Sequence, residues 1–191
     1  VKAGEIIFDG KAAVFKSPAE AVEAGIALCP EDRKEQGLVL TRSIRENTTM
    51  SVLKKVRKGP FIDKKMERSI TQEAIDRYSI KTDTMEKIAL QLSGGNQQKV
   101  ILGRWTNRLM DTKLLILDEP TKGIDIGTKA EIYQIVCDFA KQGIGVIFIS
   151  SELTEVINVS DNILVMHNGK VTGKLKREEA TEENVLALAM A

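Results

Sequence analysis

Aromatic residues, cysteine and proline are scarce in this sequence, and its charges nearly cancel. The 191 residues include two cysteines, four prolines, one tryptophan and one histidine, with 28 basic and 27 acidic side chains. A net charge of +1 lacks the basic excess of nucleic-acid-binding proteins, so no nucleic-acid partner is expected. Cys29 and Cys137 each lie in an apolar run. This placement indicates buried thiols in a reducing compartment, without a disulfide or a metal site.

Long apolar runs are also missing. No run approaches the roughly 18 residues of a membrane span, and the first residues lack the pattern of a signal peptide. We therefore expect a cytoplasmic protein, which can still dock on a membrane protein. The sequence starts without Met and runs almost directly into a strand pattern, so we interpret it as a fragment of a longer polypeptide.

One locally basic stretch is typical of a solvated helical surface and its turn: Lys54, Lys55, Arg57, Lys58, Lys64 and Lys65.

Continuous apolar runs alternate with helical patterns over most of the chain, which predicts an α/β fold with a mostly parallel sheet flanked by helices. Between Ser43 and about Ile80 the pattern is helical, split at Gly59-Pro60, and no strand is expected there. A charged loop over 31–41 precedes this helical subdomain. The other expected elements are hairpins at Asp9-Gly10 and Asn168-Gly169, strands at 25–29, 113–119 and 145–150, and helices at 94–110 and 127–142.

The strand over 113–119 ends in two carboxylates, Asp118 and Glu119. Ligands bind at the carboxyl edge of open α/β sheets. The first carboxylate suits Mg²⁺ held beside nucleotide phosphates, and the second can orient or deprotonate a water that attacks a γ-phosphate. Many apolar strands simply end in acidic residues, so this pair by itself leaves both interpretations open.

A serine and two glycines, Ser93, Gly94 and Gly95, open the helix that follows residue 92. Unpaired N–H groups and a partial positive charge at a helix N-terminus attract anions. Glycine lacks a β-carbon, so a phosphate can approach the backbone closely. A serine-capped, glycine-rich turn is the alternative interpretation of these three residues taken alone.

The order of the motifs resembles that of ATP-binding cassette (ABC) ATPases, and the resemblance covers essentially the whole chain. Residues 92–95 resemble the ABC signature, with Asn96 at the usual glutamine position. Residues 114–119 resemble the Walker B strand, and 122–125 resemble the D-loop, with Asp125 as its aspartate. The resemblance implies ATP and Mg²⁺ as cofactors, Glu119 as the catalytic residue and Asp118 as the Mg²⁺ ligand.

Two positions depart from the family pattern, and one motif is absent. Glu31 stands where the Q-loop usually has glutamine, and Ser151 stands where the switch position usually has histidine. Serine is shorter and carries no charge, so a site using it would be degenerate. The P-loop pattern G-x-x-x-x-G-K-[ST] does not occur in these 191 residues. In the family it precedes the first strand, which implies that the N-terminal P-loop portion lies before Val1.

Three stretches narrow the resemblance to the second, C-terminal cassette of monosaccharide importers, whose ATPase subunits carry two cassettes in one chain: residues 30–47, 92–100 and 117–133. The resemblance implies a head-to-tail pairing with the first cassette of the same full-length chain or with a second copy. It also implies docking on membrane permease subunits through the Q-loop and helical subdomain, with residues 31–56 as candidates, and an indirect link to a sugar-binding protein. The expected location is peripheral, on the cytoplasmic face of the bacterial inner membrane.

Within that resemblance we expect three regions. Residues 1–42 form the end of the N-terminal β part and the Q-loop, 43–92 form the helical subdomain, and 93–191 carry the signature helix, Walker B, D-loop, switch strand and C-terminal α/β part. The residues implied to contact nucleotide are Ser93, Gly94, Gly95, Asn96, Asp125, Glu31 and Ser151. Two alternatives stay open: a non-transport ABC ATPase head of the DNA-repair or chromosome type, and a docking module that does not hydrolyse ATP.

Overall fold

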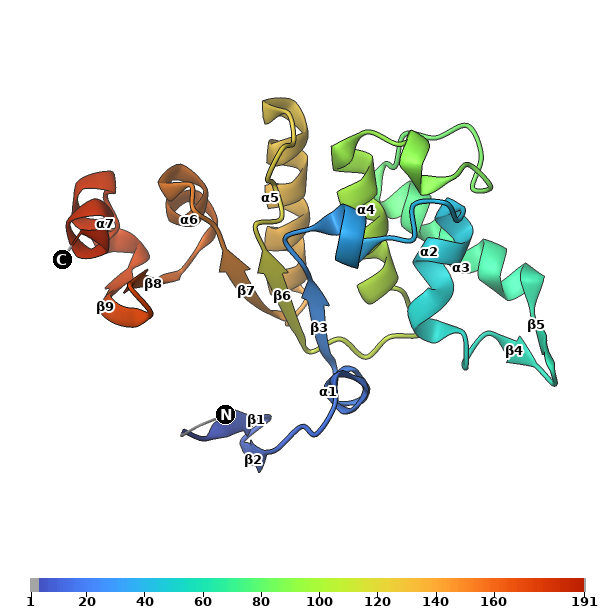
Figure 1. Ribbon diagram of the computed structural model, residues 1–191, viewed down its shortest axis with the longest axis horizontal. Coiled ribbons are helices and arrows are strands. Elements are labelled where there is room, and N and C mark those ends of the chain that lie inside the picture. The colour runs from blue at the N-terminus through green and yellow to red at the C-terminus, as the bar shows by residue number, and fades with distance from the viewer. Residues whose placement is uncertain (1–3, 191) are drawn as a thin grey trace.

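A three-stranded parallel sheet stands at the centre of the computed structural model, which describes residues 4–190 (Figure 1). Its strands are β3 (Ile26–Cys29), β6 (Leu114–Asp118) and β7 (Gly145–Ile149), paired in the order β3-β6-β7. Parallel neighbours need crossover connections, which here contain helices. The predicted α/β fold with a parallel sheet flanked by helices is therefore confirmed.

Helices cover one face of this sheet, while the other face is apolar but open. On the covered face, Leu115 and Leu117 of β6 are fully buried in a core shared with α4 (Gly94–Trp105) and α5 (Ile126–Lys141). On the opposite face, Leu28, Ile147 and Ile149 are 49%, 46% and 45% exposed. Side chains alternate between faces along a strand, so this difference runs across the whole sheet.

The helical region contains a small hairpin that the sequence did not predict. Between α2 (Ile44–Thr49) and α3 (Lys64–Tyr78), β4 (Arg57–Lys58) pairs with β5 (Phe61–Ile62) in an antiparallel ladder. The expectation of no strand here is wrong because Gly59, with φ of 64°, permits a two-residue turn where we expected only a break between helices. Part of the basic stretch thus lies on a hairpin and not on a helical surface.

Two other boundaries differ from expectation. The charged loop over 31–41 contains one π-helical turn, Arg33–Gly37, capped by the Asp32 side chain. Helix α4 ends at Trp105 and not near residue 110. The Thr106 hydroxyl donates to Leu102 O and the Asn107 amide donates to Arg104 O, so side chains take the last carbonyls and end the helix.

Arg104, near the end of α4, joins this helix to α2 and to the π-helical turn. Its buried guanidinium donates to Asn47 O at 2.7 Å, to Gly37 O at 2.6 Å and to Asn47 Oδ1 at 3.1 Å. Burial lowers the pKa of Arg104 to about 10. Burial likewise raises the pKa of the Cys29 thiol to about 12, which makes it an unreactive core residue, whereas Cys137 is only partly buried.

Most of the remaining elements lie toward the two ends of the chain. The Ser17 and Thr181 side chains cap α1 (Pro18–Ala24) and α7 (Glu182–Ala189). None of the described helices combines the length and apolar character needed to cross a bilayer. The other strands, helices and turns are β1 (Ile6–Phe8), β2 (Lys11–Ala13), α6 (Leu153–Val159), β8 (Asn162–His167), β9 (Lys170–Lys176) and 3₁₀ turns at Met50–Val52, Ala89–Gln91 and Arg177–Glu179.

Candidate functional site

The carboxyl edge of the sheet brings Glu119 and Ser151 into contact. Glu119 follows β6 and Ser151 follows β7 by one residue, and neighbouring parallel strands end at the same edge. The Ser151 N–H donates to Glu119 Oε1 at 2.7 Å, and the Glu119 N–H donates to Ile149 O at 2.9 Å. Glu119 has φ of 44°, an uncommon conformation for a residue other than glycine, and such residues cluster at functional sites.

Asp118, the last residue of β6, has a half-buried carboxylate that accepts no hydrogen bond from any described protein group. No group of three potential metal ligands occurs among residues 4–190. Mg²⁺ needs only one or two protein carboxylates when phosphates and waters complete its coordination. A single carboxylate at this position is compatible with a Mg²⁺ that arrives with a nucleotide.

Helix α4 begins at the predicted cap. The exposed Ser93 hydroxyl accepts a long hydrogen bond of 3.5 Å from the Asn96 N–H and a shorter one of 2.9 Å from Asn96 Nδ2. The Asn96 side chain is fixed in turn, because its Oδ1 accepts from the Lys81 N–H at 2.8 Å. The first amides of a 12-residue helix thus lie beside an exposed hydroxyl, a combination that suits a bound anion.

The structure gives the glycine pair an intramolecular role that we did not predict. A β-carbon at Gly95 would lie 2.1 Å from Thr128 Cγ2, and one at Gly94 would lie 2.7 Å from an Arg33 guanidinium nitrogen. Glycine is therefore required at residue 95 for close packing of α4 against α5, whereas the flexible Arg33 side chain could move aside for a β-carbon at residue 94.

Asp125 connects the D-loop-like turn to the same packing. It caps α5, accepting from the Thr128 N–H at 3.0 Å and from the Thr128 hydroxyl at 2.8 Å. These hydrogen bonds, the backbone one foremost, lower the pKa of Asp125. Because Thr128 is the residue that packs on Gly95, the Asp125 carboxylate fixes the surface on which the start of α4 rests.

Glu31 lies at the same edge but forms an ion pair. Lys122 Nζ lies 2.5 Å from Glu31 Oε1, and Arg33 donates to Lys122 O at 2.7 Å. Arg33 thereby touches both the turn after Glu119 and the start of α4. Sequence reasoning did not single out Arg33. Its position two residues after Glu31, in the turn that precedes the helical region, is the signal that was available.

Glu155, which the sequence did not indicate as a site residue, accepts more side-chain hydrogen bonds than any predicted residue at this edge. Its carboxylate, only 2% exposed, accepts hydrogen bonds from Thr121 Oγ1 at 2.6 Å, Tyr133 OH at 2.7 Å, Ser150 Oγ at 2.8 Å and Lys129 Nζ at 2.9 Å. Burial by itself raises the pKa of Glu155, but these four donors outweigh it and lower the pKa to about 2. Thr121 lies two residues after Glu119, and Ser150 lies directly before Ser151. By binding both hydroxyls, Glu155 holds in place the backbone segments that carry Glu119 and Ser151.

The predicted residues thus form two groups along one edge. Glu119 and Ser151 lie together at the strand ends, while Ser93 and Asn96 lie together at the start of α4. No hydrogen bond joins Ser93 to Glu119 within residues 4–190. The turns between the two groups connect them, through Arg33, Lys122 and Thr128.

Comparison with known proteins identifies the family. The ABC transporter family model matches residues 1–122. The chain therefore belongs to the ABC transporter family. It is 46% identical over 191 residues to the arabinose import ATP-binding protein AraG of Pectobacterium atrosepticum, covering 100% of this chain and 37% of that protein.

Two other sugar import ATP-binding proteins match this chain with similar identity and coverage. The chain is 48% identical over 188 residues to the xylose import ATP-binding protein XylG of Geobacillus kaustophilus, covering 98% of this chain and 37% of that protein. It is 47% identical over 188 residues to the ribose import ATP-binding protein RbsA of Caldanaerobacter subterraneus subsp. tengcongensis, covering 98% and 38%. The chain thus spans little more than a third of the length of these relatives.

Solved structures agree on the fold. The ADP conformation of MJ1267, an ATP-binding cassette of an ABC transporter, superposes with a TM-score of 0.77 at 23% identity, covering 99% of this chain and 77% of that one. A nucleotide-free ATP-binding cassette from an ABC transporter superposes with a TM-score of 0.76 at 24% identity, covering 97% and 74%. These similarities establish the cassette fold.

Proposed function

We propose that this chain is part of the ATP-binding subunit of an ABC importer that couples ATP hydrolysis to uptake of a monosaccharide. The observation that carries the proposal is the identity of 46–48%, over nearly the whole chain, to arabinose, xylose and ribose import ATP-binding proteins. Such a subunit acts on the cytoplasmic face of the bacterial membrane. Its partners are a second cassette, from the same full-length chain or another copy, the permease subunits and, indirectly, a sugar-binding protein.

In this proposal the two residue groups act on different nucleotides. Ser93 and the first amides of α4 hold the γ-phosphate of an ATP bound by the partner cassette. Glu119 orients a water for attack at this chain's own nucleotide, and Asp118 would hold Mg²⁺, which when bound neutralises phosphate charge. Ser151 offers no positive charge to that nucleotide. The Ser151 backbone N–H donates a hydrogen bond to the Glu119 carboxylate.

We further propose that the chain divides into three regions, 1–42, 43–92 and 93–191. Residues 31–56, which span the boundary between the first two regions, form the docking surface for the permease. The π-helical turn and α2 lie in this segment, and Arg104 joins both to the signature-like helix α4. A force on the turn or on α2 would therefore reach α4 near its C-terminal end through groups that are directly hydrogen-bonded. This continuity supports the assignment of the segment to transport coupling.

The proposed division of labour predicts unequal effects of two substitutions. Ser93→Arg places a long cation at the start of α4 and blocks the partner's site, so ATP-driven sugar uptake by the full-length subunit should be nearly abolished. Glu119→Gln affects only a site that already carries Ser151, so uptake should fall much less. Transport of labelled sugar into vesicles containing the permease measures both. Greater damage from Glu119→Gln than from Ser93→Arg would show that this chain's own site dominates.

The missing P-loop pattern gives a second prediction. The 191-residue chain by itself should show no ATP hydrolysis and little ATP affinity, because no described loop supplies the glycine-rich cradle and lysine for the phosphates. Isothermal calorimetry with ATP and Mg²⁺ measures the affinity. Stoichiometric binding would contradict this prediction, and the longer protein serves as the positive control.

A further inference from the structure

The hairpin β4–β5 presents apolar and basic side chains together at one end of the molecule. In Figure 1 it lies at the far end from α7, beyond α2 and α3. Arg57 pairs with Ile62, and Lys58 pairs with Phe61. Paired residues of an antiparallel ladder lie on the same face, so each face of the hairpin carries one cation beside one apolar side chain.

The apolar residues of the hairpin play no part in its own core. The hairpin is anchored by buried Val52, Val56 and Ile70, and the Asp63 N–H closes it by donating to Val56 O at 2.8 Å. Phe61 lies outside this cluster and is 76% exposed, and Ile62 is 44% exposed. Their burial therefore contributes little to folding, which leaves them available to a partner.

The cations around the hairpin are not neutralised internally. Lys55 donates to a backbone carbonyl, Leu109 O. Within residues 4–190 no ion pair joins a carboxylate to any of the six basic residues: Lys54, Lys55, Arg57, Lys58, Lys64 and Lys65.

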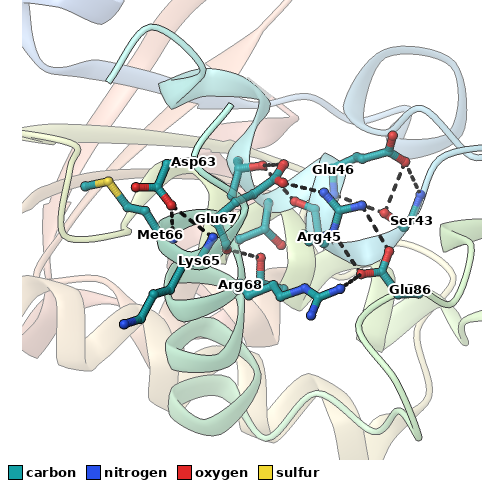
Figure 2. A network of polar contacts seen from close by, with 12 residues as sticks. Ser43, Arg45, Glu46, Asp63, Lys65, Met66, Glu67, Arg68 and Glu86 are labelled. Atoms are coloured by element: carbon teal, nitrogen blue, oxygen red, sulfur yellow. Dashed lines mark hydrogen bonds and ion pairs between the residues drawn. The ribbon is translucent and has the colours of Figure 1, made fainter. Parts of the chain in front are cut away.

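The nearest carboxylates are occupied elsewhere, as Figure 2 shows. The Asp63 carboxylate accepts hydrogen bonds from the backbone N–H groups of Lys65 and Met66 at 3.0 Å. The buried Glu67 carboxylate accepts hydrogen bonds from the Arg45 guanidinium and the Thr49 hydroxyl. The Lys65 side chain extends away from this network. The hairpin and its flanks therefore present a patch of basic side chains without ion-pair partners among residues 4–190, in which the exposed Phe61 lies opposite Lys58.

We propose that this hairpin is an interaction surface for the anionic headgroups of a lipid bilayer. Basic side chains near an anionic membrane each raise partitioning by about fivefold, and exposed Phe and Ile side chains enter the boundary between headgroups and acyl chains. Single-stranded nucleic acid fits less well, because its binding relies on several stacking aromatics and this patch has one. The proposal does not depend on ATP or on a transported sugar.

The test is sedimentation of a full-length protein containing this segment with vesicles that lack any permease. We expect binding to vesicles of phosphatidylcholine and phosphatidylglycerol, weak binding to phosphatidylcholine alone, and a decrease as salt rises. Changing Lys54, Arg57 and Lys58 to Gln should reduce the partition coefficient by about a hundredfold. Phe61→Ser should reduce it several-fold while leaving the salt dependence unchanged.

Matched controls separate this surface from general charge. Changing Lys11, Lys170 and Lys174 to Gln removes the same charge from exposed positions outside the hairpin and should leave binding unchanged. Circular dichroism of each variant checks that the fold is kept. No binding of the wild-type protein to anionic vesicles, or equal losses in the hairpin and control variants, would overturn the proposal. Binding to an RNA or DNA oligonucleotide in place of vesicles, lost in the hairpin variant, would assign the patch to nucleic acid.

Discussion

Replacing Glu155 with leucine is expected to lower the free energy of unfolding by about 3–5 kcal/mol. Leucine is similar in size but accepts no hydrogen bond, so three hydroxyl groups and the Lys129 ammonium lose a buried partner. Glu155→Gln keeps the shape and one acceptor oxygen, and its expected cost is about 1–3 kcal/mol. Urea denaturation of the 191-residue chain, followed by the fluorescence of its single tryptophan, Trp105, measures both.

The matched control is Glu152→Gln. Glu152 is 51% exposed and lies 2.6 Å from the same lysine, Lys129, so its loss should cost less than about 1 kcal/mol. Equal losses in Glu152→Gln and Glu155→Leu would show that the charge on Lys129, and not the buried network, determines the effect. Amide hydrogen exchange at residues 119–123 and 149–152 reports whether the site loosens when Glu155 is changed.

Acid provides an independent check on the same network. The pKa of Glu155, about 2, lies below its ordinary value of 4.5, so the folded state favours the carboxylate. The resulting stabilisation is fully present above about pH 4.5 and is lost as the pH falls toward about 2. The difference in unfolding free energy between the wild type and Glu155→Gln should therefore shrink through that window. A constant difference down to pH 2 would contradict an ionised Glu155.

Replacing Arg104 with methionine should cost about 1–3 kcal/mol for each of the two buried carbonyls that lose this donor. The change removes three hydrogen bonds and leaves the carbonyls of Gly37 and Asn47 without this donor. Arg104→Lys keeps the charge but not the planar fork that reaches two backbone segments, so it should recover only part of the loss. Urea denaturation with Trp105 as the probe is well placed, because Trp105 is the next residue.

The control for Arg104 lies one turn further along. Arg108 is exposed and pairs with Glu73 on the surface, so Arg108→Met should change stability by less than about 1 kcal/mol. If Arg104→Met cost no more than Arg108→Met, the buried guanidinium would not be the bridge between α2, α4 and the π-helical turn that its contacts indicate.

Local signals predicted most of the fold correctly. The strands of the sheet and the Ser93 cap follow from short-range periodicity and hydrogen-bonding chemistry, which depend on few neighbours. The hairpin at Gly59-Pro60 and the early end of α4 at Trp105 were missed. At both places the local sequence permits two conformations, a hairpin or a break between helices in the first case and an earlier or later helix end in the second. Contacts with the rest of the fold determine which one forms.

The candidate site was predictable only in part for a related reason. Asp118, Glu119 and Ser93 lie where strand ends and a helix start can be recognised from sequence. Glu155 and Arg33 cannot be recognised that way, because their importance comes from groups on other elements. The acceptor role of Glu155 exists only once Thr121, Lys129 and Tyr133, which lie 34, 26 and 22 positions away, are folded around it. Long-range polar networks have no period along the chain.

The open face of the parallel sheet has a consequence for how this protein is handled in the cell. Its exposed leucine and isoleucine side chains form a flat apolar plane, and parallel sheets in α/β proteins are ordinarily covered on both sides. Such an apolar surface promotes aggregation of the chain during synthesis unless another layer covers it.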